Sequence, residues 1–352
     1  MMENHNFPPR QARLLRHNLL KWYQPHHRNL PWRALWQKYR NPYHVWVSEI
    51  MLQQTTIKAV LLVYSKFLNR FPTISKLANA EEEDVRLAVR GLGYYRRFSN
   101  MHRAAKEITD ERQGKFPKTY DELLELPGIG PYTASAIASI AFNEAHAVVD
   151  GNTERILCRV FDIRQPSNSP KLKPYFRKWA AQLLDHENPG DFNQAFMELG
   201  QLVCRPGEPD CEICPFTKVC LARKNQSQLL APAPKIKKPS QSLDLQLTIF
   251  VQKNKIGIVQ RAETDKFLKS TWGFATILGK NTSKQKSTRI GQVKHNITHH
   301  QINAGVWIDE QTKSKNIRWF SPDKIEENLV SNLDRKALKL FFRFAGSQEL
   351  VH

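Results

Sequence analysis

The spacing of apolar residues predicts helices over the first two-thirds of the chain. Between Val45 and Leu68, apolar side chains recur at steps of three and four residues, which places them on one buried helix face. Thr119 followed by Glu122 is a capping-box pattern, and Pro131 suits the first turn of a helix that continues to about residue 141. The same periodicity predicts further helices at 81–90, 152–164, 171–184 and 191–203.

The pattern changes after residue 230. The stretch 231–240, APAPKIKKPS, is too rich in proline and lysine for a core, so we expect a linker there. Beyond it, LQLTIFV and KIGIVQ are typical of paired strands, VWID and IRWF of two more, and 335–345 of a closing helix. We therefore expect a mainly helical domain at 1–228, a linker at 229–242 and a small α+β domain at 243–352.

Charge points to a polyanionic partner. The 352 residues hold 53 Lys and Arg against 33 Asp and Glu, a net charge of +20. Residues 266–308 contain no acidic residue but carry Lys266, Lys269, Lys280, Lys284, Lys286, Arg289 and Lys294. A field of one sign favours nucleic acid as the partner. No apolar run could span a bilayer and the chain opens MMENHNFPPRQAR without an apolar leader, so we expect an intracellular protein, cytoplasmic or nucleoid-associated in a bacterium, with no membrane partner.

Four of the five cysteines lie close together in the sequence. They are spaced C-x6-C-x2-C-x5-C, as Cys204, Cys211, Cys214 and Cys220. Four thiolates at this spacing suit a tetrahedral zinc ion or an iron–sulfur cluster, and composition alone leaves the two about even. Two disulfides are the alternative, which the lack of a secretory leader disfavours.

A glycine-containing turn joins two of the predicted helices. In LPGIGPYTASAIA, Gly128 and Gly130 leave backbone amides bare at the start of the next helix, where a DNA phosphate could approach. Glycines in such turns also serve tight packing. The combination of this turn with four cysteines downstream is more specific than either feature alone.

Two carboxylates stand out from their surroundings. Glu49 interrupts the apolar helix start VWVSEIML, and Asp150 ends an apolar segment just before a new helix. Local pattern favours ordinary roles, with Asp150 as a helix cap and Glu49 on a polar helix face. The functional alternative is a protonated acid paired with an ionised carboxylate, which cleavage of a glycosidic bond requires.

A series of motifs then carries a family resemblance. The motifs RNLPWR, NPYHVWVSEIMLQQT, GLGYYRR, LPGIGPYTASAI and VDGNTERIL, followed by the four-cysteine loop, occur in an order that closely resembles adenine DNA glycosylases of the MutY type, from about residue 15 to 220. The resemblance implies a helix-hairpin-helix glycosylase fold and a [4Fe–4S] cluster held by the four cysteines. It further implies a monomer that acts on double-stranded DNA and releases adenine paired with 8-oxoguanine or guanine.

The resemblance also implies roles for individual residues. It makes Glu49 the acid that protonates adenine at N7 and Asp150 the carboxylate that stabilises the sugar cation. Around the adenine pocket it places Trp32, Arg33, Tyr132 and Glu198, and around the orphan 8-oxoguanine it places Gln53, Gln54 and Tyr94. The spacing from Arg33 to Asn41 is a few residues longer than the family pattern. Aromatic packing and surface exposure are the plain alternatives for Trp32, Tyr94 and Glu198.

Tyr132 bears on the type of reaction. Related enzymes that also cut the strand carry a lysine in this turn, whose amine forms a Schiff base with the sugar. Tyrosine lacks that amine, so we expect a monofunctional enzyme that leaves an abasic site. A bifunctional endonuclease-III-like enzyme and a non-catalytic DNA-damage-binding protein are the rival hypotheses.

The C-terminal domain resembles a Nudix fold more loosely. The Glu-rich metal-binding box of working Nudix hydrolases, G-x5-E-x7-R-E-x2-E-E, does not occur in the sequence. In HNITHHQ, Ile297, Thr298 and His299 stand where the family carries an aromatic-Ser/Thr-His loop, so Thr298 and His299 become candidates for reading 8-oxoguanine. A basic segment that only raises DNA affinity is the alternative.

Overall fold

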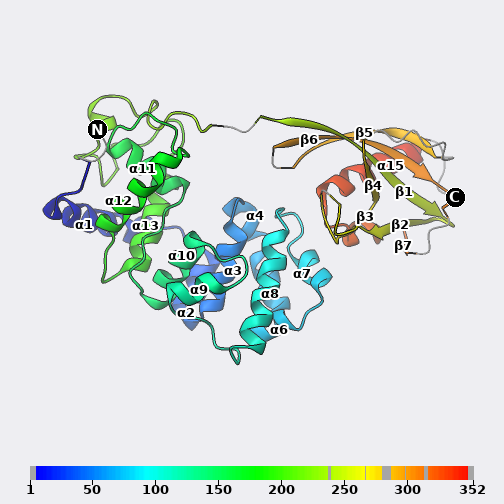
Figure 1. The fold of residues 1–352 in the computed structure, drawn as a ribbon, viewed down its shortest axis with the longest axis horizontal. Helices are drawn as coiled ribbons and strands as arrows, with labels where there is room; N and C mark the ends of the chain where they lie inside the picture. Colours follow the sequence, from blue (N-terminus) through cyan, green and yellow to red (C-terminus); the bar gives the residue numbers. More distant parts are fainter. Residues whose placement is uncertain are drawn as a thin grey trace. The chain divides into compact units, whose positions relative to one another are not determined.

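The computed structural model describes residues 5–236, 239–265, 267–279, 287–297, 299–312 and 316–347. The chain divides into two compact units (Figure 1). Residues up to Asn79 and Asn100–Lys237 form the first unit, and Ala80–Ser99 groups with the chain from Lys238 onward as the second. None of the helices in the described ranges combines the length and the apolar character that crossing a membrane requires. The domain boundaries expected from sequence stay a prediction.

The first unit is helical, as the apolar periodicity predicts. Its helices are α1 (Pro9–His26), α2 (Pro31–Tyr39), α3 (Pro42–Leu52), α4 (Ile57–Leu61), α5 (Tyr64–Arg70), α6 (Ile74–Ala78), α8 (Arg96–Asp110), α9 (Tyr120–Glu125), α10 (Pro131–Phe142), α11 (Gly151–Val160), η1 (Pro170–Leu172), α12 (Lys173–Leu183), α13 (Pro189–Leu202) and α14 (Leu221–Lys224). Helix α8 crosses the boundary between the two units, and α7 (Glu82–Ala88) belongs to the second.

Local sequence signals explain where several helices begin. Proline occupies the first turn of α1, α2, α3, α10, α12 and α13, where its missing N–H group costs no helical hydrogen bond. The capping box at the start of α9 is confirmed, because Thr119 accepts from the Glu122 amide while the Glu122 carboxylate accepts from the Thr119 amide.

The single helical face expected from Val45 to Leu68 is wrong as one element. The structure has α3, α4 and α5 there, because the chain turns after Leu52 and Gln54 adopts a left-handed conformation with φ +52°. The periodicity persists across the breaks because Val60, Tyr64 and Phe67 are all fully buried. Apolar spacing therefore marked several buried positions correctly, but it missed the turns, and Leu61, which it also placed on the buried face, is 43% exposed.

Two layers of packing hold the first unit together. One core joins α1, α11, α12 and α13, which lie side by side in Figure 1, and includes Leu19, Leu157, Trp179 and Phe196. Helix α3 packs against α2 and α10 and is buried from Val45 to Met51. A helix that is apolar on every side is expected in the interior of a protein.

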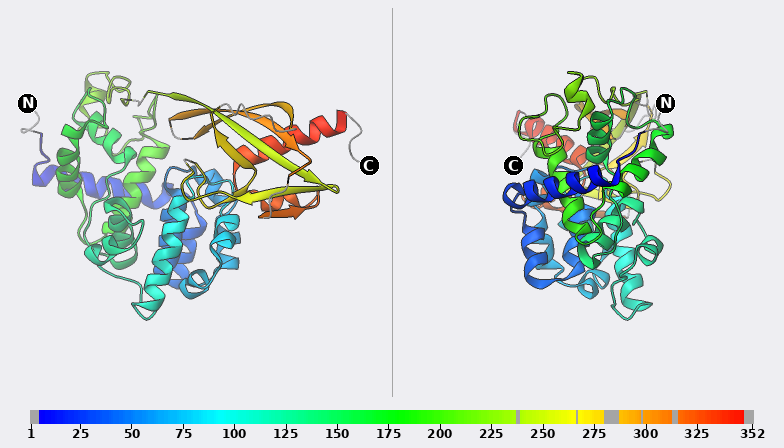
Figure 2. Two further views of the ribbon diagram at one scale, coloured as in Figure 1. Left: turned by 45° about the vertical axis from the view of Figure 1, so that its right-hand side comes forward. Right: turned by 90° about the vertical axis from the view of Figure 1, so that its left-hand side faces the viewer.

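From Gln241 onward, the second unit is a seven-stranded sheet with the helix α15 packed on it (Figure 2). The strand order is β3-β2-β1-β6-β5, with β4 also pairing β1 and β7 also pairing β2. The strands are β1 (Gln241–Gln252), β2 (Lys255–Gln260), β3 (Trp272–Gly273), β4 (Ala275–Leu278), β5 (Thr288–Ile297), β6 (His300–Asp309) and β7 (Ile317–Phe320). The short η2 (Ile325–Asn328) and α15 (Asn332–Ser347) follow.

The longest strand pairing among the described residues joins β1 to β6. Strands β1 and β6 run parallel over ten residue pairs, from Gln241↔His300 to Phe250↔Asp309. The other pairings are antiparallel. Apolar residues of β1, β2, β6 and α15 share one core that includes Ile249, Ile258, Val306 and Leu338. The small α+β fold expected from sequence is confirmed for this unit.

Two details differ from expectation. Strands β3, β4 and β5 form in the basic, acid-free stretch, at residues where no strand was expected. In the expected linker, residues up to 236 contact the helical unit: Asn168 exchanges hydrogen bonds with the backbone of Ile236, at 3.0 and 3.2 Å, and Pro166 bridges to Ala233.

Candidate active site

A cavity of about 720 Å³ opens between helices of the first unit. Both singled-out carboxylates, Glu49 and Asp150, line it. Its wall also contains Trp32, Arg33, Gln54, Tyr132 and Glu198, all of them residues that the sequence analysis named. Polar and charged side chains stand beside apolar ones around the cavity. A concave site on which polar groups converge is typical of a small-molecule or base pocket.

Glu49 is a buried acid. It lies on α3, 5% of its surface is exposed, and burial raises the pKa of its carboxyl to about 7, while a hydrogen bond with Tyr132 and the charge of Arg33 lower it. Its Oε2 atom is buried and has no hydrogen-bond partner among the described residues. The expectation of a polar helix face is therefore wrong, because α3 has no such face at this position. A carboxyl in this environment holds a proton close to neutral pH.

Asp150 has the opposite environment. As the N-cap of α11, its Oδ1 accepts from the amides of Asn152, at 3.0 Å, and Thr153, at 2.8 Å. Its Oδ2 accepts from the Asn152 side chain at 2.7 Å. The predicted cap is confirmed, and the same donors at a helix N-terminus favour a negative charge beside the cavity.

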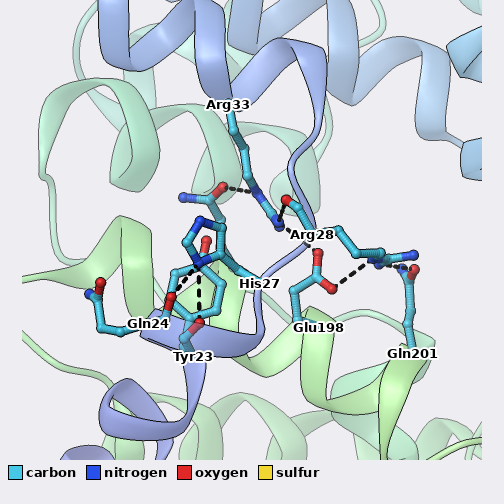
Figure 3. Close-up of polar contacts among 8 residues, drawn as sticks. Tyr23, Gln24, His27, Arg28, Arg33, Glu198 and Gln201 are labelled. Atoms are coloured by element: carbon cyan, nitrogen blue, oxygen red, sulfur yellow. Dashed lines mark hydrogen bonds and ion pairs between the residues drawn. The ribbon is translucent and has the colours of Figure 1, made fainter.

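A salt-bridge cluster forms one wall of the cavity (Figure 3). Glu198, only 1% exposed, accepts from Arg33 at 2.7 Å through Oε1 and from Arg28 at 2.8 Å through Oε2. Arg33 also donates to Gln194 at 2.8 Å, and Arg28 to Gln201 at 2.6 Å. The simple solvated role for Glu198 is wrong, because both of its oxygens are engaged in the protein interior.

Residues on one face of α13 contribute to this wall. Gln194, Met197, Glu198 and Gln201 all line the cavity. They are spaced i, i+3, i+4 and i+7, which places them on one face of a helix. Only Glu198 was singled out from sequence. Arg28 was also missed, although it begins the RNLPWR motif that supplied Trp32 and Arg33.

The aromatic residues Tyr132 and Trp32 also line the cavity. Tyr132, at the start of α10, donates to the Met197 sulfur at 3.4 Å, and burial raises its pKa well above the usual value. Trp32 is 7% exposed and meets Tyr64 edge to face, with ring centroids 5.4 Å apart. Trp32 is therefore both a packed aromatic and a lining residue of the cavity.

The two glycines in the turn before α10 differ in backbone conformation and in surroundings. Gly128 has φ +81°, and a Cβ there would lie 2.6 Å from the Cβ of Asn100, so the position requires glycine for conformation and for packing. Gly130 is the N-cap of α10 with φ −100°, and a Cβ there would meet nothing within 4 Å. The open space at Gly130 lies beside the first amides of a twelve-residue helix.

The three residues expected around the orphan 8-oxoguanine, Gln53, Gln54 and Tyr94, do not share one environment. Gln53 donates to the Thr133 hydroxyl at 3.1 Å, and Gln54 lines the cavity with a left-handed backbone. Tyr94 is 48% exposed with φ +49°, so it is not a core aromatic. Tyr94 belongs to the segment that groups with the second unit.

The four cysteines converge. Cys204, Cys211, Cys214 and Cys220 line one small pocket, and none of them forms a disulfide. The disulfide alternative is therefore wrong. In the described parts of the chain, no three His, Cys, Asp or Glu side chains are grouped as a site for a single metal ion.

Arg159 ties the cysteine loop to its surroundings. It is 4% exposed and donates to the Cys204 sulfur at 3.3 Å, to the carbonyls of Arg205 and Gly207 at 2.8 and 3.0 Å, and to that of Ala231 at 3.0 Å. No local pattern marked this arginine, since its partners lie 45 to 72 residues away.

Of the two residues expected to read the lesion in the second unit, Thr298 lies outside the described residues. His299 is described and half-buried between β5 and β6, with its ring centroid 4.1 Å from that of His300.

Comparisons with known proteins agree with this architecture. The model of the HhH-GPD superfamily of base excision DNA repair proteins matches residues 47–182. The chain is similar to an adenine DNA glycosylase of Buchnera aphidicola subsp. Baizongia pistaciae, at 33% identity over 307 residues, covering 82% of this chain and 84% of that protein. It is 45% identical over 223 residues to the human adenine DNA glycosylase, covering 61% of this chain and 41% of that protein. The chain thus spans less than half the length of the human, rat and mouse relatives.

Solved structures resemble the helical part. A thermostable thymine-DNA glycosylase aligns with a TM-score of 0.55 and 25% identity, over 61% of this chain and 97% of that one. A non-covalent endonuclease III–DNA complex aligns with a TM-score of 0.52 and 22% identity, over 62% of this chain and 98% of that one, which is a likeness of fold alone.

Proposed function

The chain belongs to the adenine DNA glycosylase family, and from this premise we propose that it hydrolyses the N-glycosidic bond of adenine in duplex DNA. We propose further that the adenine stands opposite 8-oxoguanine or guanine, and that the product is an abasic site in an intact strand. The observation that carries the proposal is the pair of carboxyl groups on one cavity, Glu49 desolvated and Asp150 held by three donors.

The two carboxyl groups divide the reaction between them. The protonated Glu49 would donate its proton to the leaving adenine as the bond to the sugar breaks, because Glu49 lines the cavity and its Oε2 has no hydrogen-bond partner among the described residues. The anionic Asp150 would face the positive charge that develops on the sugar. Water then adds to the anomeric carbon, its proton is released, and the abasic sugar is left.

The wall of α13 would recognise the base. Arg28, Arg33, Gln194 and Gln201 offer donors and acceptors that are already fixed by Glu198 and by each other. Polar groups that are held in place before the ligand arrives select it with little loss of conformational entropy. Adenine must leave the base stack to reach this wall, at a cost of a few kcal/mol.

The turn before α10 would hold the DNA backbone. Its Gly130 leaves open space beside the first amides of the helix, where a phosphate is favoured by the helix dipole. The tyrosine at position 132 has no amine with which to attack the sugar, so the proposed reaction is hydrolysis without strand cleavage.

We propose a [4Fe–4S] cluster at the four cysteines. The fit rests on four unpaired thiols around one pocket, which is the arrangement that a cluster with four separate iron–sulfur bonds needs. The cluster would supply structure to the loop rather than chemistry to the base. Purified protein should absorb broadly near ~400 nm, as thiolate-bound iron does. Stoichiometric zinc without iron in anaerobically purified protein would contradict the proposal.

One assay tests the reaction. Purified protein is incubated with a duplex that carries a single adenine–8-oxoguanine pair, and the strands are analysed with and without alkali. We expect strand breaks only after alkali, together with free adenine. Breaks without alkali would support the endonuclease-III-like alternative, and binding without any adenine release would support a non-catalytic protein.

A Glu49→Gln variant provides the matched control. Glutamine keeps the shape of the side chain but cannot act as an acid, so adenine release should be lost while binding of the mispair remains. Adenine release at a near wild-type rate by this variant would remove Glu49 from the mechanism.

A further inference from the structure

The C-terminal end of α2 stands out by its residue types. Helix α2 continues to Tyr39, and Arg40 ends it in a left-handed conformation with φ 49°. This end of the helix carries two aromatic residues and two cations, Trp36, Lys38, Tyr39 and Arg40, which we call the α2 rim.

The α2 rim touches the proposed active site. Trp36 is half-buried and lines the same cavity as Glu49 and Asp150. Tyr39 lies three residues further on, on the neighbouring turn of the same side of the helix, and is 56% exposed. An aromatic ring with more than half of its surface in water at the end of a short helix makes little contribution to the core.

Cations accompany both rings. The guanidinium carbon of Arg40 lies 5.3 Å from the Trp36 ring centroid, and the Lys38 ammonium lies 4.9 Å from that of Tyr39. Both cations are exposed. Such cation–aromatic pairs hold the rings in a fixed orientation while the charges stay in contact with water.

The charge of the surrounding sequence has one sign. Residues 4–80 contain twelve Lys and Arg and a single acidic residue, and that residue is the buried Glu49. The α2 rim therefore lies in a segment that offers no exposed carboxylate of its own to neutralise Lys38 and Arg40. A polyanion is the partner that such a segment favours.

We propose that the α2 rim is a stacking platform for the DNA strand that delivers its base into the cavity. The inference rests on the proposed function for the identity of that strand. The rings of Trp36 and Tyr39 would stack on base faces that the extruded nucleotide leaves uncovered, and Lys38 and Arg40 would contact the adjoining phosphates. Aromatic faces with interspersed cations bind single-stranded segments in this way with little preference for sequence. A docking surface for another protein is the competing use of the same residues.

The test measures binding without chemistry. A fluorescein-labelled duplex with a tetrahydrofuran abasic analogue opposite 8-oxoguanine is titrated with the full chain, and affinity is read by anisotropy at several salt concentrations. We expect Tyr39→Ala and Trp36→Ala each to weaken binding roughly 10-fold, since one lost base stack is worth about that factor. Trp36→Phe should restore most of the loss. Lys38→Ala should reduce the slope of log affinity against log salt by about one.

Matched controls separate the rim from general effects. Leu14, which is 52% exposed on α1, and Lys178, exposed on α12, do not line the cavity, so Leu14→Ala and Lys178→Ala should bind like wild type. If Tyr39→Ala and the Trp36 variants bind as tightly as these controls, the platform is overturned. Because Tyr39 is exposed, its removal should leave thermal unfolding unchanged, which keeps the result free of folding defects.

The experiments distinguish a failure of the stacking platform from a failure of the proposed function. Wild-type protein that binds the duplex but releases no adenine would refute the proposed reaction, while the rim variants would still report on the platform. Normal adenine release by wild type together with unaltered DNA binding by every rim variant would refute the platform alone.

Discussion

Exclusion of water lets a carboxyl group keep its proton near neutral pH, and Glu49 is in that situation because α3 is buried from Val45 to Met51. The raised pKa makes the expected rate depend on pH in one direction. The rate constant for adenine release should be flat below about pH 7 and fall about tenfold per unit above it, as Glu49 ionises. Single-turnover measurements across pH check this, and a rate that rises steadily into alkaline pH would contradict the role of Glu49 as the acid.

The same group links pH to stability. The folded protein holds the Glu49 proton up to about pH 7, whereas the unfolded chain releases it near the ordinary value of 4.5. The free energy of unfolding therefore falls through this site as pH rises from about 4.5 to about 7. Glu49→Gln removes the effect, so the variant should gain stability relative to wild type between pH 5 and pH 8. Chemical denaturation at the two pH values measures the difference, and an equal offset at both would exclude the linkage.

In the proposed mechanism, the side chain of Tyr132 decides between hydrolysis and strand cleavage. The side chain is buried beside Glu49 and lines the cavity, so a lysine at this position would bring an amine to the proposed site of the sugar. Tyr132→Lys should give some covalent protein–DNA adduct on borohydride treatment, and Tyr132→Phe should give none. A lysine variant that releases adenine but traps no adduct would show that this side chain does not reach the sugar.

At the scale of an element, the two glycines of the turn before α10 should have different roles, Gly128 in stability and Gly130 in DNA binding. Gly128→Ala should lower the free energy of unfolding by at least about 1 kcal/mol, because alanine is strained at φ +81° and would collide with Asn100. Gly130→Ala should change stability by less than about 0.5 kcal/mol, since its Cβ would meet open space.

The effect on duplex binding should differ from the effect on stability. A methyl group at Gly130 would occupy space beside the first amides of α10, so Gly130→Ala should weaken duplex binding despite its normal stability. Thermal unfolding and anisotropy on the same preparations compare the two variants. Unchanged binding by Gly130→Ala would mean that the phosphate does not approach there.

The elements also show what local sequence can and cannot predict. Proline and the capping box located the starts of α10 and α9, because those signals act on the backbone within one turn. The breaks after Leu52 were missed, because the buried face continues through α4 and α5. Glu198 and Arg28 are 170 residues apart, and only the packing of α1, α2 and α13 brings them together. The cavity could therefore be predicted in part, residue by residue, while its salt-bridged wall could not.

At the scale of the whole molecule, lesion recognition remains a prediction. Thr298 lies outside the described residues and His299 lies between β5 and β6. Replacement of both by alanine should weaken binding to adenine–8-oxoguanine by about 1–3 kcal/mol more than binding to adenine–guanine, as expected for a small set of base contacts. Competition binding on the two duplexes measures this preference. An equal loss on both would assign the residues to general DNA affinity.

The long parallel pairing of β1 with β6 has a mechanical consequence. The chain passes between the two units in three places, and the last of these passages leads into β1, so tension applied there acts along that strand. Ten consecutive rungs join β1 to its neighbour, and a pull along the strand axis loads them in shear, all at once rather than one after another. The sheet should therefore resist being pulled apart from the start of β1 under such tension.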